Sequence, residues 1–192
     1  EKAHAEAIVW HGQSYDYSWL SARIIYWSGR VTSAGIRPGD VVLLQGDFSP
    51  NSIALLLALI EQSCICVPLN ADRFHERNIL AKSALANWII EIDREDTATI
   101  GPRQEEQGHE LYDLLRRNGR PGIVFFTSGS TGVSKAVVHD LQKLLRKYAV
   151  KRHDLRTLAF LLFDHIGGFD TLFYVLSNGS ALVIPETRTP EW

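Results

Sequence analysis

The sequence predicts an α/β fold in which a mixed, largely parallel sheet is flanked by helices. The first observation is a set of short apolar runs, continuous at residues 41–44 and 64–67 and interrupted only by Glu91 at residues 88–92, which are typical of strands buried on both faces. The second observation is that helical patterns separate these runs, so strands and helices alternate along the chain. This alternation favours a parallel or mixed sheet covered by helices.

The N-terminal part of the chain supplies the first elements. Residues 7–10 and 14–17 flank a glycine-containing turn at 11–13, and this pattern predicts a β-hairpin. Ser18 is expected to cap a helix that ends near Gly35, because apolar residues then recur at intervals of three and four.

Two further helices and a connector are expected in the middle of the chain. Asn51 can cap a helix that continues through residue 60, and a third helix is expected over residues 74–85. Residues 93–108 are polar and charged with no clear period, which indicates a loop, and a short helix is expected over 110–117. If the domain is subdivided, we expect the boundary near residues 93–121.

The last third of the chain continues the alternation. Apolar runs at 123–126 and 136–138 predict a second hairpin, and Asp140 is expected to cap the helix that follows it. The remaining expected elements are a buried strand over 158–163, a helix over 169–176 and a strand over 181–184.

Composition excludes several classes of protein. The chain has 192 residues, 45% of them hydrophobic, which suffices for the core of one domain. The net charge is −2 and the basic residues are scattered, so neither nucleic acid nor an anionic membrane surface is an expected partner. The longest apolar run, residues 53–60, is too short to span a bilayer.

The cysteines and the first residues point to the cytoplasm. Cys64 and Cys66 are alternate residues of one apolar strand, so both should face the same side, as free thiols in a reducing compartment. The first residues lack the apolar core of a signal peptide. The histidines show no metal-ligand spacing, and no protein metal site is predicted.

The most informative stretch runs from Phe125 to Lys135 and reads Phe-Phe-Thr-Ser-Gly-Ser-Thr-Gly-Val-Ser-Lys. An apolar strand leads into small and hydroxylated residues at 127–132, and a lysine follows. Glycines allow backbone angles at which successive N–H groups converge on an anion. The hydroxyls and the mobile ammonium group add donors. A loop of this composition suits the phosphates of a nucleotide.

Three interpretations of this loop compete. A flexible Gly/Ser connection between two strands would need no ligand. A Walker phosphate loop requires a Gly-Lys-Ser/Thr ending that opens into a helix. Here Lys135 follows Ser134 and the β-type run 136–138 comes next, which excludes the Walker interpretation. The third interpretation is a family resemblance.

The run from Thr127 to Lys135 resembles the phosphate-binding signature of the adenylate-forming superfamily. This superfamily includes acyl- and aryl-CoA synthetases, luciferases and the adenylation domains of nonribosomal peptide synthetases. The family pattern places proline before the lysine, where this chain has Ser134. This difference weakens the rigidity of the loop more than its chemistry. The resemblance implies that the chain is the first part of the large domain of an adenylate-forming enzyme.

A second motif follows in the run Phe-Asp-His-Ile-Gly-Gly at 163–168. It resembles the superfamily's next motif, an aromatic residue or histidine followed closely by glycine. His165 is the matching position, and in acyl- and aryl-CoA synthetases this residue borders the carboxylate pocket and the pantetheine tunnel. Gly167 and Gly168 would let substrate or backbone approach closely. An isolated histidine of this kind is more often structural, so the assignment depends on the phosphate signature.

Two neighbouring acidic residues have alternative explanations. In peptide-synthetase adenylation domains an aspartate near this motif binds the amino group of the substrate. Strand alternation predicts that Asp164 points away from the side of His165, which favours a structural role in hydrogen bonding to nearby backbone. His139 and Asp140 could be a catalytic dyad, but a hairpin end followed by a helix cap explains them better.

The resemblance implies two half-reactions. A carboxylate attacks the α-phosphate of ATP to give an acyl-adenylate and pyrophosphate, and a thiol then displaces AMP. Positioning and electrostatic stabilisation of the leaving phosphates carry such catalysis, with Mg²⁺ held mainly by phosphate oxygens and water. The implied ATP-binding residues are Thr127, Ser128, Gly129, Ser130, Thr131, Gly132 and Lys135. The implied catalytic residues are Lys135 and His165, and the implied substrate-binding residues are His165, Gly167 and Gly168.

Three functions remain open from the sequence. The favoured one is a ligase that joins a small-molecule carboxylic acid to CoA. An amino-acid adenylation domain, which transfers to the pantetheine of a carrier protein, is the alternative among enzymes. A noncatalytic nucleotide-binding or interaction module is the alternative outside them.

The extent of the resemblance adds a further expectation. The family's later motifs for AMP and ribose, and the lysine of its mobile C-terminal domain, do not follow His165, and the chain has no methionine. We therefore expect residues 1–192 to be the N-terminal part of an adenylation domain without the C-terminal domain, with little activity alone. A truncated sheet should leave apolar surface exposed and favour self-association.

Overall fold

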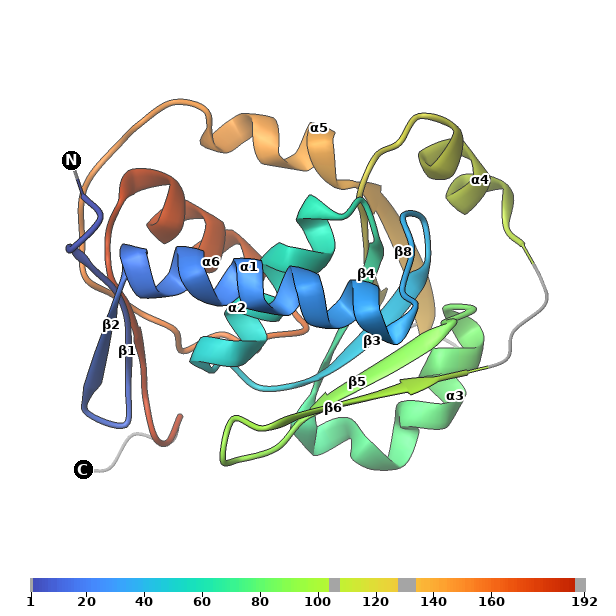
Figure 1. Ribbon diagram of the computed structural model, residues 1–192, viewed down its shortest axis with the longest axis horizontal. Coiled ribbons are helices and arrows are strands. Elements are labelled where there is room, and N and C mark those ends of the chain that lie inside the picture. Colours follow the sequence, from blue (N-terminus) through green and yellow to red (C-terminus); the bar gives the residue numbers. More distant parts are fainter. Residues whose placement is uncertain (1, 104–107, 128–133, 189–192) are drawn as a thin grey trace.

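The chain folds into two sheets with helices around them, which confirms the predicted mixed α/β class (Figure 1). The computed structural model describes residues 2–103, 108–127 and 134–188. Within these residues, the larger sheet has six strands in the order β6-β5-β3-β4-β7-β8, and the smaller has four in the order β2-β1-β10-β9.

Parallel strands form the centre of the larger sheet. β3 (Val41–Gly46) lies between β4 (Ile65–Asn70) and β5 (Trp88–Ile92), and β4 also pairs with β7 (Gly122–Thr127). All of these pairs are parallel, as the continuous apolar runs predict.

Antiparallel strands form both edges of this sheet. β6 (Ala98–Pro102) pairs with β5, so the prediction that residues 93–108 form a loop is wrong for this part. The edge strand is half-exposed and carries a glycine and a proline, so it lacks the apolar run that marks a buried strand. At the other edge β8 (Lys135–Asp140) pairs with β7, which confirms the predicted hairpin.

Helices cover both faces of the larger sheet because its central strands are apolar on both sides. Val42 and Leu44 of β3 belong to the core beneath α1 and α2, whereas Val41 and Leu43 belong to the core beneath α3 and α4. The bounds of these helices are α1 (Tyr17–Ala34), α2 (Pro50–Glu61), α3 (Arg77–Ser83) and α4 (Glu110–Arg117). The last of these is the short helix that was predicted.

The helix starts differ from the predicted ones. Asp16 caps α1 in place of Ser18, and Ser49 caps α2 in place of Asn51. In each case a good capping side chain stands two residues earlier, and a proline at the first helical position fixes the start of α2. α1 ends as predicted at Gly35, whose φ of 102° is left-handed.

The predicted third helix is split in two. A 3₁₀ helix, η1 (Ala71–Glu76), precedes α3, and Arg73 within it has non-helical angles of φ −89° and ψ 23°. The Asn70 side chain accepts a hydrogen bond from the N–H of Asp72 and so starts the turn directly after β4.

The smaller sheet joins the two ends of the described chain. The predicted hairpin of β1 (Glu6–Trp10) and β2 (Gln13–Asp16) is present, and β1 also pairs in parallel with β10 (Leu182–Ile184). Its fourth strand, β9, covers only Thr157–Leu158, so the predicted strand over 158–163 is wrong beyond its first residue. That apolar run is largely surface: the exposed fraction of Phe160 is 61%.

The helices of the last third follow the hairpin. Asp140 caps α5 (Leu141–Leu145), as predicted, and η2 (Arg146–Tyr148) continues it. α6 (Ile166–Asn178) begins three residues before the predicted start and ends at Gly179.

One of the buried clusters contains residues of both sheets. Ile8 and Leu182 of the smaller sheet belong to the same buried cluster as Leu44 of the larger one. Cys64 and Cys66 are fully buried in this cluster, which confirms that both face the same side. The boundary proposed near residues 93–121 stays a prediction. In the described part of the chain no helix has both the length and the apolar character needed to cross a membrane.

Candidate functional site

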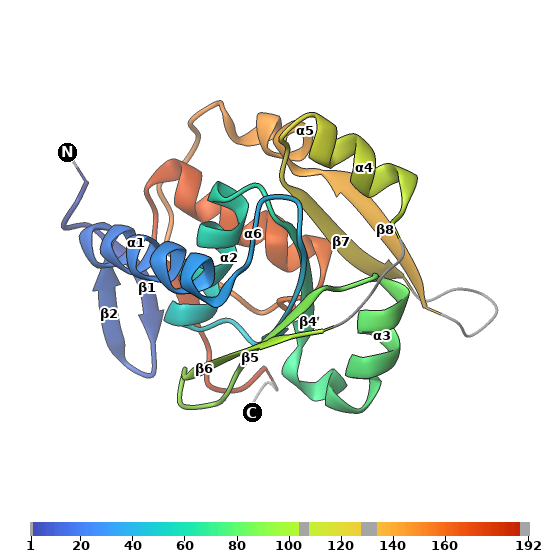
Figure 2. The ribbon, with the colours of Figure 1, turned by 45° about the vertical axis from the view of Figure 1, so that its right-hand side comes forward.

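The β7–β8 hairpin holds the two ends of the glycine- and hydroxyl-rich loop. Thr127, the last residue of β7, lies opposite Lys135, the first residue of β8, and both are exposed. Figure 2 shows this hairpin at one edge of the larger sheet. The fold therefore fixes where the loop leaves the sheet and where it returns. The predicted phosphate-binding residues Ser128, Gly129, Ser130, Thr131 and Gly132 lie outside the described residues.

The residues of β8 alternate between the core and the opposite face. Ala136 and Val138 pack against the cluster beneath α3 and α4. Val137 and His139 point the other way, where both line a pocket. The pattern of β8 therefore aims one face of the hairpin at the candidate site.

This pocket lies beside the hairpin and has a volume of about 650 Å³. Its walls come from the hairpin, from η1 and from the segment that precedes α6. The polar residues that line it are Arg73, Thr127, Ser134, His139, Asp164 and His165. The apolar ones are Phe125, Phe126, Val137, Leu162 and Ile166. The two sequence motifs therefore meet at one pocket, although they are far apart along the chain.

His165 stands at the N-cap position of α6. Its side chain makes no capping hydrogen bond and is exposed. The ring is therefore not committed to holding the helix start. The segment before it is not the predicted strand, because the backbone turns at 163–164 and leads directly into the helix.

Gly167 and Gly168 allow the first turn of α6 to lie against the preceding segment. A Cβ on Gly168 would stand 2.0 Å from the carbonyl oxygen of Leu162, and one on Gly167 would stand 2.7 Å from a methyl carbon of Leu161. Close approach of backbone, one of the two expectations for this pair, is therefore observed. The approach of substrate to these glycines stays a prediction.

Asp164 differs from its predicted role. It lines the same pocket as His165, so the prediction that the two point to different sides is wrong. Strand alternation does not apply because Asp164 lies in a turn. Its exposed fraction is 7%, and its Oδ2 lies 3.7 Å from Nη1 of Arg73. Among the described residues its Oδ1 has no hydrogen-bond partner.

Arg73 is a charged residue of the pocket that no motif indicated. Its Nε and Nη2 donate to the two carboxylate oxygens of Glu76, over 3.2 and 2.8 Å. This hydrogen bonding lowers the pKa of Glu76 and raises the pKa of Arg73. Arg73 follows β4, which pairs in parallel with β7, so both strands run toward the same edge of the sheet. Polar residues that follow the carboxyl ends of parallel strands were the signal that could have indicated it.

His139 and Asp140 do not form a catalytic dyad. Asp140 accepts from the N–H of Lys143 as the cap of α5 and forms a 2.8 Å ion pair with Arg120. His139 instead lines the pocket and packs against Phe125, with ring centroids 5.9 Å apart. The structural explanation of the pair is confirmed for Asp140. The register of β8 against β7 places His139 in the pocket. The sequence analysis did not predict which face of the hairpin His139 would occupy.

The hairpin residues fit the phosphates of a nucleotide. Thr127 supplies a hydroxyl and Lys135 an exposed ammonium, at the two points between which the loop must run. In the described ranges no cluster of three or more His, Cys, Asp or Glu residues could hold a metal ion.

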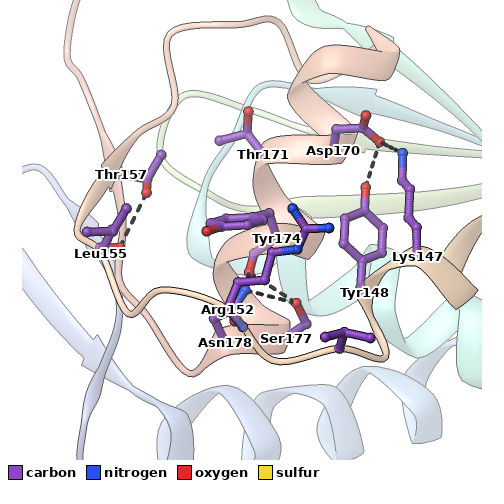
Figure 3. Close-up of a pocket in the computed structure, with 11 residues that line it drawn as sticks. Lys147, Tyr148, Arg152, Leu155, Thr157, Asp170, Thr171, Tyr174, Ser177 and Asn178 are labelled. Atoms are coloured by element: carbon purple, nitrogen blue, oxygen red, sulfur yellow. Dashed lines mark hydrogen bonds and ion pairs between the residues drawn. The ribbon is translucent and has the colours of Figure 1, made fainter.

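A second pocket, of about 520 Å³, lies between the segment after α5 and helix α6 (Figure 3). At one end Asp170 accepts from Lys147 and from the Tyr148 hydroxyl, over 2.6 Å each. Burial, with help from Asp170, raises the pKa of Tyr148. At the other end the Asn178 amide donates to the carbonyl of Tyr174 over 2.7 Å. These polar groups bond to one another, and neither predicted motif reaches this pocket.

Comparison with known proteins identifies the family. The family model described as AMP-binding enzyme matches residues 75–192, more than half of the chain. The chain therefore belongs to the AMP-binding enzyme family.

Two relatives extend the match toward the N-terminus. Pyochelin synthetase PchE of Pseudomonas aeruginosa is 28% identical over 198 residues, which cover 96% of this chain and 14% of the relative. The hybrid PKS-NRPS synthetase xenE of Xenoacremonium sinensis is 27% identical over 195 residues, covering 92% of this chain and 5% of the relative. The chain thus spans a small part of the length of these relatives.

Solved structures share the fold at lower identity. The N-terminal subdomain of NpsA from Klebsiella oxytoca, in complex with 3-hydroxyanthranilyl-AMSN, has a TM-score of 0.77 and 19% identity, over 97% of this chain and 50% of that one. NpsA-ThdA of the same organism, an artificially fused adenylation-PCP di-domain NRPS, has a TM-score of 0.73 and 19% identity, over 97% and 40%. The chain thus matches the fold of about half of the NpsA subdomain.

Proposed function

We propose that this chain is the N-terminal part of an adenylation domain of the nonribosomal peptide synthetase type. The domain would activate an amino acid or a related carboxylic acid with ATP, as an acyl-adenylate. The observation that carries this proposal is the meeting of the two motifs: Thr127 and Ser134 of the first motif line a pocket that also contains Asp164 and His165. Lys135 lies opposite Thr127 in the hairpin.

The hairpin end is the proposed site of the ATP phosphates. The hydroxyl of Thr127 and the ammonium of Lys135 would bind the β- and γ-phosphates together with the loop residues Ser128, Gly129, Ser130, Thr131 and Gly132. Each hydrogen bond to a charged phosphate contributes about 1.5–3 kcal/mol. Bound Mg²⁺ would neutralise charge on the pyrophosphate as it leaves. The same residues stabilise that charge while the acid attacks the α-phosphate.

The pocket beside the hairpin is the proposed site of the acid. His165 and Thr127 would lie near the reacting carboxylate, with Gly167 and Gly168 giving it room. The buried Oδ1 of Asp164, which has no partner among the described residues, can accept a hydrogen bond from the ammonium of an amino acid. Aromatic and aliphatic walls from Phe125, Val137 and their neighbours suit an apolar side chain.

The acceptor of the activated acid is proposed to be a carrier-protein pantetheine. One of the similar proteins is named a hybrid PKS-NRPS synthetase, and one of the similar structures is an adenylation-PCP fusion. Both support a carrier protein as the acceptor more than they support free CoA. Transfer to CoA is the second candidate, because His165 occupies the position that borders the pantetheine tunnel in CoA synthetases. We also propose a cytoplasmic location and self-association of the isolated chain, whose surface carries large exposed side chains such as Phe160.

Acid-dependent exchange of pyrophosphate into ATP tests the proposal. The adenylation domain that contains this chain should catalyse the exchange with a subset of amino acids, whereas the isolated chain of 192 residues should show little or none. Loading of a holo carrier protein, with free CoA offered in parallel, then identifies the acceptor. Absence of exchange with every acid in a broad panel, by a folded domain, would refute the proposed function.

A further inference from the structure

Resting on the proposed function, one further role can be assigned within the same pocket. We propose that Arg73 is a specificity-determining residue that weakens the preference of the pocket for acids carrying an α-ammonium group. It does so by competing with that ammonium for Asp164.

The competition follows from where the two charges lie. Nη1 of Arg73 is 3.7 Å from Oδ2 of Asp164, and both side chains line the pocket. Oδ1 of the same carboxylate is buried and has no hydrogen-bond partner in the described part of the chain. A ligand ammonium that binds Oδ1 must therefore approach within a few ångströms of a guanidinium of the same sign. The repulsion between them is substantial because Asp164 is 7% exposed and screening by water is limited.

Glu76 controls how much of the Arg73 charge reaches Asp164. The bidentate hydrogen bonds from Nε and Nη2 engage the guanidinium with Glu76, whereas the 3.7 Å contact to Asp164 is longer than a hydrogen bond. Arg73 thus serves two carboxylates, and the three groups together carry one net negative charge. Loss of Glu76 would release the guanidinium toward Asp164, and loss of Arg73 would leave Asp164 to the ligand.

The other titratable groups of the pocket are His139 and His165. Both contribute imidazoles rather than fixed charges, and both belong to elements other than η1. Arg73 is the fixed cation closest to Asp164 among the described residues, at 3.7 Å. The negative charge of Asp164 and the positive charge of Arg73 therefore oppose each other in the pocket. An acid can bind there with or without an α-ammonium group. This feature fits a domain that takes aromatic or apolar acids with and without an α-amino group.

The test compares acid pairs in the pyrophosphate exchange assay with the adenylation domain that contains this chain. Each apolar or aromatic amino acid is paired with its desamino analogue, and the readout is the ratio of the two kcat/KM values. Arg73→Gln should raise this ratio in favour of the amino acid by about tenfold, the effect of removing one nearby like charge. Glu76→Gln should lower it, and Arg73→Lys should keep it near the wild-type value.

Arg77→Gln is the matched control. Arg77 lies one helical turn further along, bonds to Glu91 over 2.5 Å and does not line the pocket, so the ratio should not change. If Arg73 were merely structural, Arg73→Gln would lower both kcat/KM values and leave their ratio unchanged, which would overturn the inference. A ratio that rises in Glu76→Gln would overturn it as well, even if Arg73→Gln did not fold. If the wild type catalyses pyrophosphate exchange but the variants have the same ratio of kcat/KM values as the wild type, only this inference is refuted. If the wild type catalyses no exchange with any acid, the proposed function is refuted.

Discussion

Leu162 and Gly168 are in backbone contact that leaves no room for a side chain. A Cβ on Gly168 would stand 2.0 Å from the carbonyl oxygen of Leu162 and 2.9 Å from its carbonyl carbon. The contact presses the segment that carries Asp164 and His165 against the first turn of α6. The glycine pair thus positions the second motif as well as starting the helix.

The first prediction is that Gly168→Ala destabilises the fold. The obstructing atoms are backbone, which cannot rotate away, so α6 or the preceding segment must move at a cost of about 1–3 kcal/mol. Urea unfolding of the isolated chain measures the loss. Gly29→Ala is the control, because Gly29 lies within α1 and a Cβ there meets nothing within 4 Å. The control should be neutral or stabilising by up to about 1 kcal/mol, and equal midpoints for both variants would contradict the prediction.

The two glycines show what sequence patterns could and could not foresee. Their spacing after His165 predicted a close approach, and the structure supplies one with backbone. The pattern could not predict that Asp164 would turn into the pocket, because strand alternation holds only while the backbone is extended. The apolar run at 158–163 suggested a buried strand. Burial depends on which other elements of the fold pack over a segment, and here Phe160 remains on the surface.

The second prediction concerns Lys135 in the phosphate-binding hairpin. Lys135→Ala should raise the KM for ATP in the adenylation domain by about 10- to 100-fold, since one charge-assisted hydrogen bond of about 1.5–3 kcal/mol is lost. The side chain is exposed, so the unfolding midpoint should not change. Lys82→Ala, an exposed lysine in the last turn of α3, is the control and should leave the KM unaltered. Wild-type ATP kinetics in Lys135→Ala would count against the role of this hairpin.

The third prediction is a pH-dependent contribution of Asp140. Burial opposes its ionisation, but hydrogen bonds from Arg120 and the Lys143 N–H outweigh it and lower the pKa below the ordinary 3.8. A lowered folded pKa means that the stabilisation is fully present above the ordinary value and is lost as the pH falls through the folded one. Asp140→Ala should therefore cost about 1–2 kcal/mol at neutral pH.

Stability curves from pH 7 down to about pH 2 test this sign. The difference between wild type and Asp140→Ala should shrink below pH 3.8, the ordinary value of the carboxyl group. Arg120→Gln should show a smaller loss with the same dependence, because it removes the ion pair and keeps the helix cap. A difference that stays constant over the whole range would show that the charge of Asp140 contributes nothing.

The site as a whole was predictable only in part, for a physical reason. The β7–β8 hairpin and α4 are encoded locally, by apolar runs, turn residues and spacing that a sequence displays. The contact between Arg73 and Asp164 depends on the order of strands in the sheet, since β4 lies beside β7 and so carries η1 to the pocket. Strand order comes from the packing of the whole chain, and no motif near Arg73 reports it.

The last prediction concerns the two buried thiols. Burial raises the pKa of Cys64 to about 12 and that of Cys66 well above its ordinary value, so almost no thiolate forms in the folded chain at neutral pH. The thiolate is the reactive form, and both sulfurs are enclosed by the core. A thiol reagent at pH 7.5 should therefore label neither cysteine faster than the chain unfolds, and both should react at once in denaturant. Rapid labelling of a folded sample would contradict this prediction. If the variant Cys64→Ser were then not labelled, the reacting thiol would be that of Cys64, and the start of the strand at Cys64 would open to solvent.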